Sequence, residues 1–180
     1  MGQHLTLILG GARSGKSDHA QMLVQEDKQS VLFVATATAG DEEMAHRIAV
    51  HRANRPVNWQ TLEAPLKIAA AIENAPQAPW VLVDCITLLL SNILMTCSEP
   101  IDEVLYHKKV EEEIDELIAC YVNHTGKWVM VSNEVGLGLV PAYTMGRYYR
   151  DALGRANQKL AKVADRVILM VAGIPMIVKE

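Results

Sequence analysis

The segment of this 180-residue chain best equipped for chemistry is GGARSGKS at positions 10–17. It matches the phosphate-binding pattern G-x-x-x-x-G-K-[ST] and directly follows the apolar run Leu5–Leu9. In this pattern the glycines let successive backbone N–H groups face phosphate oxygens, while the lysine places a positive charge near the β- and γ-phosphates. The hydroxyl of Ser17 can bind Mg²⁺. We therefore predict a nucleoside triphosphate site at this segment, in preference to a plain glycine-rich turn.

A single carboxylate, Asp84, follows the apolar run Trp80–Val83. An acid at the end of a buried strand is expected of the second element of such a site, where it holds Mg²⁺ directly or through water. The alternative is an N-cap for the segment Ile86–Ile93, because Asp is favoured at that position. We favour the first interpretation, which makes Ser17 and Asp84 the predicted metal ligands and Mg²⁺ the predicted cofactor.

Basic side chains and histidines are concentrated at positions 41–56, which read DEEMAHRIAVHRANRP. Guanidinium groups suit phosphate because their fork of donors stays charged and matches the oxygens. A neutral imidazole among them can attack phosphorus while the arginines offset the charge of the transition state. Taken alone, His46 and His51 are more simply explained as solvent-facing side chains of a helix.

Two further segments leave alternatives open. The loop Asn133–Pro141 has two glycines and a carboxylate after the run Trp128–Val131, so it is either a substrate or phosphate contact or a simple strand-to-helix turn. The acidic cluster at positions 111–116 lies in a stretch whose apolar residues recur at helical spacing. That spacing favours the solvated face of an amphipathic helix over a metal site.

Five nearly continuous apolar runs predict strands that are covered on both faces, at Leu5–Leu9, Val31–Ala35, Trp80–Val83, Trp128–Val131 and Val167–Val171. Helices are expected between them, at Lys16–Gln25, Asp41–Arg52, Pro65–Glu73, Ile101–Val122 and Met145–Ala164. This alternation implies right-handed crossovers and a mainly parallel sheet, whose carboxyl edge carries the ligands. We predict one α/β domain over 1–180, a three-layer P-loop NTPase fold of the RecA-like kind, with a C-terminal hairpin at one edge of the sheet.

Composition excludes several classes of protein. The formal net charge is −4 and aromatic residues are 5% of the chain, so neither a nucleic-acid surface nor a base-stacking platform is expected. The three cysteines form no C-x-x-C pair, which predicts free thiols in a reducing compartment. No apolar stretch has the length of a membrane span or the form of a signal peptide. We therefore expect a cytoplasmic protein without nucleic-acid or membrane partners.

Seven ordered blocks together resemble the bifunctional adenosylcobinamide kinase / adenosylcobinamide-phosphate guanylyltransferase family of cobalamin biosynthesis. The resemblance covers essentially the whole chain, and seven blocks in order are far more specific than a P-loop alone. The blocks are GGARSGKS at 10–17, ATA at 35–37, DEEM at 41–44, RIAVHRANRP at 47–56, LVDCITLLLSN at 82–92, SNEVGLGLVP at 132–141 and RYYRDALGRANQKLA at 147–161.

The resemblance implies two reactions. GTP or ATP phosphorylates adenosylcobinamide, and GTP then guanylylates that phosphate through a covalent GMP–histidine. The histidine inside R-I-x-x-H-R-x-x-R-P is His51, the implied nucleophile, with Lys16 as the second catalytic residue; His46 lies one turn outside the pattern. The family also favours a homo-oligomer. The implied nucleotide contacts are Gly10, Gly11, Ala12, Arg13, Ser14, Gly15, Lys16, Ser17, Ala35, Thr36, Ala37, Arg52, Ala53, Asn54, Arg55, Glu63 and Asp84.

Two competing functions share part of this evidence. A P-loop small-molecule kinase without guanylyltransferase activity would use positions 10–17 and Asp84 in the same way, but it gives no reason for the block around His51. A nucleotide-binding switch would bind GTP tightly, turn it over very slowly and ignore corrinoids. In the bifunctional case, one P-loop serves GTP in both reactions, or the kinase step uses a separate nucleotide mode.

Overall fold

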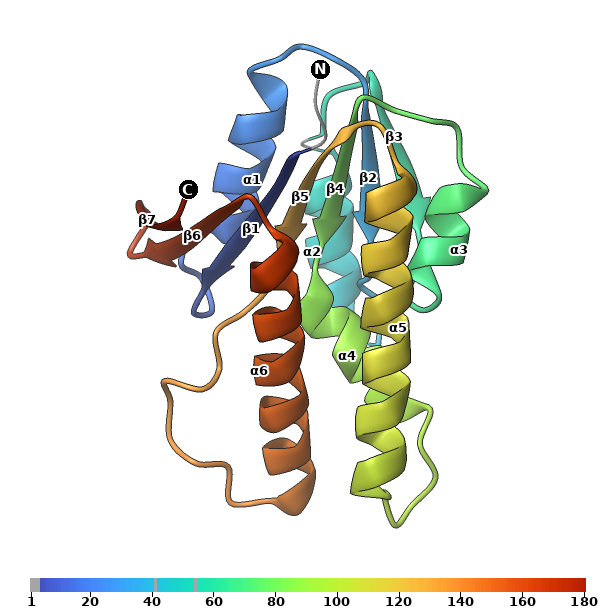
Figure 1. Cartoon of the computed structure of the whole chain (residues 1–180), viewed down its shortest axis with the longest axis vertical. Coiled ribbons are helices and arrows are strands. Elements are labelled where there is room, and N and C mark those ends of the chain that lie inside the picture. The colour runs from blue at the N-terminus through green and yellow to red at the C-terminus, as the bar shows by residue number, and fades with distance from the viewer. Residues whose placement is uncertain (1–3, 41, 54) are drawn as a thin grey trace.

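A computed structural model describes residues 4–40, 42–53 and 55–180, without the side chains at positions 43, 44, 47, 48 and 51. Within these residues, seven strands form one sheet in the order β3-β2-β4-β5-β1-β6-β7 (Figure 1). Every neighbouring pair is parallel except β6 and β7. The strands are β1 (His4–Gly10), β2 (Val31–Ala35), β3 (Trp59–Glu63), β4 (Trp80–Asp84), β5 (Lys127–Val131), β6 (Arg166–Val171) and β7 (Ile174–Lys179).

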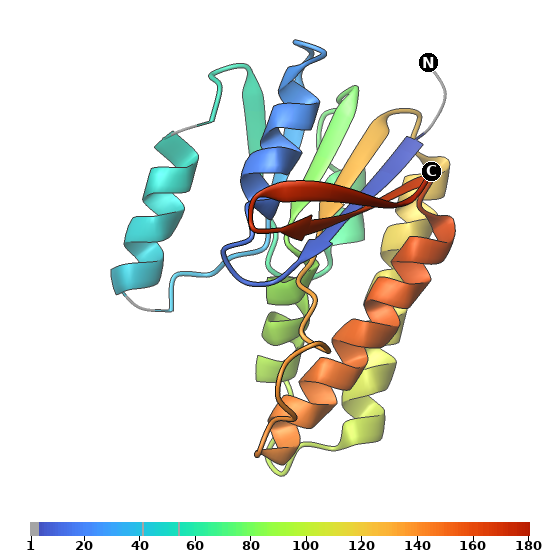
Figure 2. The ribbon, with the colours of Figure 1, turned by 90° about the vertical axis from the view of Figure 1, so that its left-hand side faces the viewer.

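Helices cover both faces of the sheet, which gives the three layers that the sequence predicts (Figure 1). Helix α1 packs through Ala20 and Val24 on one face. The larger core on the other face is built with α3, α4, α5 and α6. Figure 2 shows α2 on the opposite side of the sheet from α5 and α6, standing away from the strands. The helices are α1 (Lys16–Gln25), α2 (Glu42–Ala53), α3 (Ile68–Glu73), α4 (Ile86–Met95), α5 (Glu103–Asn123) and α6 (Thr144–Val163).

The predicted α/β class, the mainly parallel sheet and the C-terminal edge hairpin are all confirmed, and the predicted strands and helices lie within three residues of the observed ones. The edge strand β3 was not predicted. Its sequence, WQTLE, has only Trp59 and Leu62 as apolar residues, because an edge strand is half exposed. Such a strand lacks the continuous apolar run that marks a central strand of a parallel sheet.

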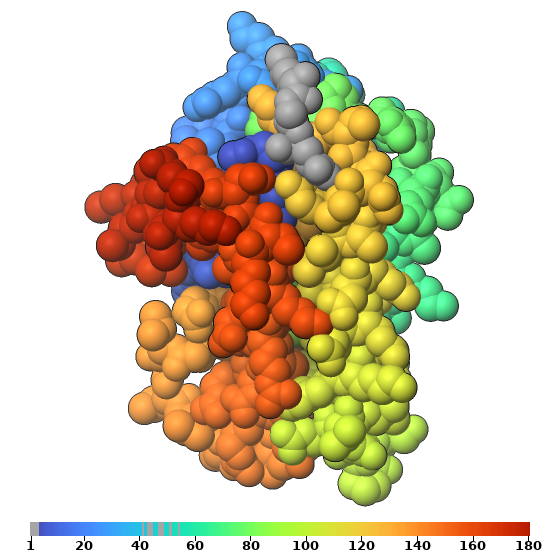
Figure 3. Space-filling model, in the orientation of Figure 1, coloured from blue at the N-terminus to red at the C-terminus, as the bar shows by residue number. Residues whose placement is uncertain are grey.

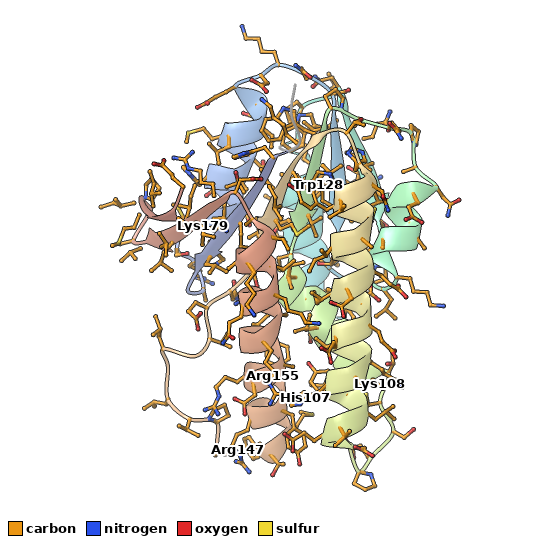
Figure 4. All side chains as sticks on the ribbon, viewed as in Figure 1. His107, Lys108, Trp128, Arg147, Arg155 and Lys179 are labelled. Carbon is orange, nitrogen blue, oxygen red and sulfur yellow. The ribbon has the colours of Figure 1, made fainter. Side chains whose placement is uncertain are left out.

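The two long helices α5 and α6 lie side by side and are joined by polar contacts along their length (Figure 4). Arg155 Nη1 lies 3.3 Å from His107 Nδ1, and Lys159 Nζ donates to Asp115 Oδ1 at 2.8 Å.

Within residues 4–40, 42–53 and 55–180, no helix combines the length and apolarity that a membrane crossing demands.

Glu113 departs from the solvated acidic face expected for α5. Its side chain is buried, whereas its neighbours Glu111, Glu112, Asp115 and Glu116 are exposed. The carboxylate accepts hydrogen bonds from the backbone N–H groups of Lys67 at 3.2 Å and Ile68 at 2.8 Å. Glu113 therefore supplies, from another helix, the cap that α3 lacks locally.

Candidate active site at the carboxyl edge of the sheet

The P-loop adopts the strand–loop–helix form that its sequence predicts. Strand β1 ends at Gly10, and α1 begins at Lys16 with Gly15 as its N-cap at φ +88°. At Gly10, φ is +154° and a β-carbon would lie 2.6 Å from the carbonyl oxygen of Met170. Both positions therefore require glycine, and the loop presents the N-terminal end of α1 to an anion.

The C-terminal hairpin braces this loop from outside. The N–H of Gly173, in the turn between β6 and β7, donates to the Ser14 carbonyl at 3.1 Å. A β-carbon at Gly15 would lie 3.4 Å from the Gly173 α-carbon, so the two backbones are in close contact. This contact joins residues about 160 positions apart in the chain, and no local sequence pattern predicted it.

Lys16 is held inside the loop by the loop's own oxygens. Only 8% of the residue is exposed, and Nζ donates to the Gly11 carbonyl and lies 3.4 Å from Ser14 Oγ. Burial lowers the pKa of Lys16, while the nearby Cys85 and Asp84 oppose that shift. The ammonium group is therefore close to the end of β4 and already oriented by oxygen acceptors that phosphate oxygens can replace.

A hollow of about 550 Å³ brings the predicted phosphate and metal residues together. Asp84 ends β4, and Cys85 rather than Asp84 is the N-cap of α4, so the N-cap alternative for Asp84 is wrong. The hollow combines a cationic group, a carboxylate and a hydroxyl at a helix N-terminus. Its lining residues are Ala12, Arg13, Ser14, Gly15, Lys16, Ser17, Asp18, Asp84, Cys85, Val131 and Asn133.

The segment Ala35–Ala37 lies beside Asp84 at the end of β2. Ala35 and Thr36 are buried and Ala37 is half-buried. The Thr36 hydroxyl accepts a hydrogen bond from the Cys85 N–H at 2.8 Å and donates to the Cys85 carbonyl at 2.7 Å. This segment therefore adjoins Asp84 and Cys85 but is not among the residues that line the hollow, and the Thr36 side chain is bonded to the protein.

Two arginines occupy the β3 side of the same edge. Arg52 Nη1 and Glu63 Oε1 form an exposed ion pair at 3.1 Å. The Arg55 guanidinium lies 3.6 Å above the ring centroid of Phe33 and donates to Thr61 Oγ1 at 3.1 Å. Burial lowers the pKa of Arg55, and the negative charge of Asp84 is the main influence that opposes this shift. Arg55 is therefore fixed on an aromatic face within the electrostatic reach of Asp84.

The predicted nucleophile is placed only through its backbone. His51 belongs to the last turn of α2, but its side chain lies outside the described residues. The predicted contact Asn54 also lies outside them, whereas Ala53 and the alternative nucleophile His46 are exposed. The choice between His51 and His46 therefore stays a prediction.

The loop after β5 is anchored to the P-loop side of the site. Asn133 N–H donates to Thr87 Oγ1 at 2.7 Å, its carbonyl accepts from Asn157 Nδ2 at 3.0 Å, and Glu134 N–H donates to the Gly10 carbonyl at 3.0 Å. The Glu134 carboxylate accepts from Gly136 N–H at 2.6 Å within its own loop. Asn133, which the sequence singled out only as part of this segment, is the residue that lines the hollow.

The profile of the family described as "Cobinamide kinase / cobinamide phosphate guanyltransferase" matches residues 6–178. The chain belongs to this family. It is 45% identical over 174 residues to the bifunctional adenosylcobalamin biosynthesis protein CobP of Pseudomonas aeruginosa, covering 96% of each chain. It is 40% identical to the bifunctional adenosylcobalamin biosynthesis protein CobU of Salmonella typhimurium, covering 97% of this chain and 99% of that one. Among solved structures, the RadB recombinase aligns at 13% identity with a TM-score of 0.49, covering 93% of this chain and 74% of that one.

Membership of this family confirms the resemblance that the seven sequence blocks indicate. The chain is a transferase of the cobinamide kinase / cobinamide phosphate guanyltransferase type, and its co-substrate is a nucleotide. The relatives are named bifunctional, which favours this assignment over a kinase alone or a nucleotide switch.

Proposed function

We propose that the hollow at the P-loop serves both reactions. In the first, the aminopropanol hydroxyl of adenosylcobinamide attacks the γ-phosphorus of GTP or ATP and the nucleoside diphosphate leaves. In the second, GMP passes from GTP to the new phosphate, giving adenosylcobinamide-GDP and pyrophosphate. The observation that carries the proposal is the convergence of Lys16, Ser17 and Asp84 on one hollow at the start of α1.

Mg²⁺ fits the oxygen donors of this hollow. We propose that Ser17 and Asp84 hold it together with phosphate oxygens, because Mg²⁺ is usually bound by one or two protein oxygens plus the substrate. No group of three or more His, Cys, Asp or Glu side chains forms a metal site in the described part of the chain. When bound, Mg²⁺ would neutralise phosphate charge, and Lys16 would exchange the Gly11 and Ser14 oxygens for those of the β- and γ-phosphates.

For guanylyl transfer, we propose that a ring nitrogen of His51 attacks the α-phosphorus of GTP and expels pyrophosphate. A phosphate oxygen of adenosylcobinamide phosphate then attacks the same phosphorus and releases His51. Two displacements replace one difficult step. The position of Arg55, half-buried on the ring of Phe33 and within the electrostatic reach of Asp84, supports a role in balancing the charge of these transition states.

The test is incubation with α-³²P-GTP and Mg²⁺, followed by electrophoresis and mapping of the labelled peptide. The proposal expects acid-labile, base-stable label that is lost in His51→Ala and kept in His46→Ala, the matched control on the same helix. Transfer from γ-³²P-GTP to adenosylcobinamide should persist in part in His51→Ala. Label retained in His51→Ala would refute the assignment of His51 as the nucleophile. Absence of label in the wild-type protein would refute the guanylyltransferase reaction and leave only the kinase activity.

We also propose that copies of the chain associate. Strand β7 is the last strand of the sheet, and all six of its residues are exposed (Figure 3). Ile174 and Val178 are 66% and 64% exposed, although an unpaired apolar edge is a liability in a monomer. Sedimentation of the wild type and of Val178→Lys tests this: an oligomer weakened by the substitution is expected, and a wild-type monomer would refute it.

Free thiols at Cys85, Cys97 and Cys120 support a reducing, cytoplasmic location, which cell fractionation can check.

A further inference from the structure

Thr36 is wholly buried, and both functions of its hydroxyl are used by one neighbour. The hydroxyl accepts from the Cys85 N–H at 2.8 Å and donates its hydrogen to the Cys85 carbonyl at 2.7 Å. The Thr36 N–H donates to the Asp84 carbonyl at 3.3 Å. Thr36 therefore binds both backbone groups of the residue that follows Asp84, and its hydroxyl hydrogen is not available to a ligand unless this bond breaks.

Asn92, one of the half-buried residues of α4, extends this contact to the next strand. Its side-chain amide donates to the Thr36 carbonyl at 2.8 Å and to the Pro65 carbonyl at 2.9 Å, which uses both hydrogens. Ala64 N–H donates to the Ala35 carbonyl at 2.9 Å beside them. Asn92 thus ties the chain after β2 to the chain after β3, two residues beyond Glu63.

We infer that Thr36 and Asn92 are positioning residues, which hold the ends of β4, β2 and β3 so that Asp84 faces the P-loop. The regular bonding of the sheet stops at these strand ends. The Cys85 carbonyl also accepts the Leu89 N–H of α4 at 3.2 Å, whereas the Cys85 N–H takes its partner from the Thr36 side chain. Partners of this kind orient metal-binding groups, and their loss typically weakens metal binding about 10–100-fold. The inference rests on the proposed function, because it assumes that Asp84 serves the phosphate–metal site.

The experiment compares Thr36→Val, which keeps the shape and removes the hydroxyl, with Thr36→Ser, which restores the hydroxyl. Mn²⁺ affinity is measured by electron paramagnetic resonance with a non-hydrolysable GTP analogue, and analogue affinity is measured again without metal. Thr36→Val should bind Mn²⁺ about 10–100-fold more weakly and bind the metal-free analogue like wild type, since the P-loop is unchanged. Thr36→Ser should recover most of the Mn²⁺ affinity.

Thr38→Val is the matched control, because Thr38 is an exposed threonine two residues further on. It should behave as wild type. If Thr36→Val does not fold, Asn92→Leu tests the same inference, because it should also weaken Mn²⁺ binding. Equal loss of metal-free analogue binding in Thr36→Val would mean that the hydroxyl contacts the nucleotide and would overturn the inference.

Asp84→Asn separates the two ideas. Wild-type Mn²⁺ affinity in Asp84→Asn would refute the metal assignment of the proposed function. If Asp84→Asn binds Mn²⁺ more weakly while Thr36→Val and Asn92→Leu both bind it like wild type, the positioning inference alone is refuted. Hydrogen exchange of the Cys85 amide gives a readout without metal, and it should accelerate in Thr36→Val and not in Thr38→Val.

Discussion

Replacing Glu113 by Gln should destabilise the protein more than the same change at any exposed acidic position of α5. The Glu113 carboxylate is buried and accepts the N–H groups of Lys67 and Ile68, one on each oxygen. Gln has one accepting oxygen, and its NH₂ group would face the second N–H as another donor. The start of α3 would therefore lose one hydrogen bond to a charged group and keep a weaker, neutral one.

The size of the effect follows from these contacts. A hydrogen bond to a charged group contributes about 1.5–3 kcal/mol, and a buried unpaired N–H costs about 1–3 kcal/mol. We expect Glu113→Gln to lower the free energy of unfolding by roughly 2 kcal/mol. For a domain of this size, that lowers Tm by about 4–8 °C.

Urea unfolding followed by tryptophan fluorescence measures the change, with Glu116→Gln as the control. Glu116 is on the same helix and exposed, so its substitution should shift the free energy of unfolding by no more than about 0.5 kcal/mol. Equal stability of the two variants would refute the capping role of Glu113.

Three further predictions test contacts at both edges of the sheet. Lys179 donates to the last carbonyls of α6 at 3.1 and 3.2 Å (Figure 4), so Lys179→Met should cost about 1 kcal/mol and speed hydrogen exchange in the hairpin. Burial lowers the pKa of His124 below 6.5, and its Nδ1 accepts the Gly126 N–H at 2.9 Å. Because the folded protein then binds fewer protons than the unfolded chain, the neutral imidazole stabilises the fold above pH 6.5, and this stabilisation is lost as the pH falls. Urea titrations at pH 7.5 and 5.0 should therefore show a smaller drop in the free energy of unfolding for His124→Gln than for wild type. Arg55→Lys removes the flat contact on Phe33 and should weaken GTP binding by about 1 kcal/mol in calorimetry.

The features that could be predicted from the sequence depend on local patterns. A central strand of a parallel sheet is covered on both faces, so Val31–Ala35 is continuously apolar and can be recognised from the sequence. The P-loop can be recognised because Gly10 and Gly15 adopt backbone angles that other residues rarely reach, which fixes glycine at these two places in the pattern. Asp84 was found by combining these two signals, since an acid after a buried strand must lie at the ligand edge.

The features that were missed depend on contacts between distant segments. The bond from Gly173 to Ser14 and the cap from Glu113 to Ile68 each require that two segments far apart in sequence meet in space. Glu113 has the same residue type as its exposed neighbours, and only the helix register relative to α3 distinguishes it. The hydroxyl of Thr36 likewise has no visible partner until β2 and β4 are known to be adjacent.

The strand order also supports the proposal that one P-loop serves both reactions. The ends of β4, β5 and β1 are neighbours, so Asp84, Asn133 and the P-loop line one hollow, while Arg55 approaches from the β2 and β3 side. Under the proposed function, Lys16 binds the β- and γ-phosphates in both steps. In the kinase step, these phosphates include the group that is transferred; in the guanylyl step, they are the pyrophosphate that leaves. One cation therefore stabilises the developing charge in both reactions, and only the nucleophile, a substrate hydroxyl or His51, has to differ.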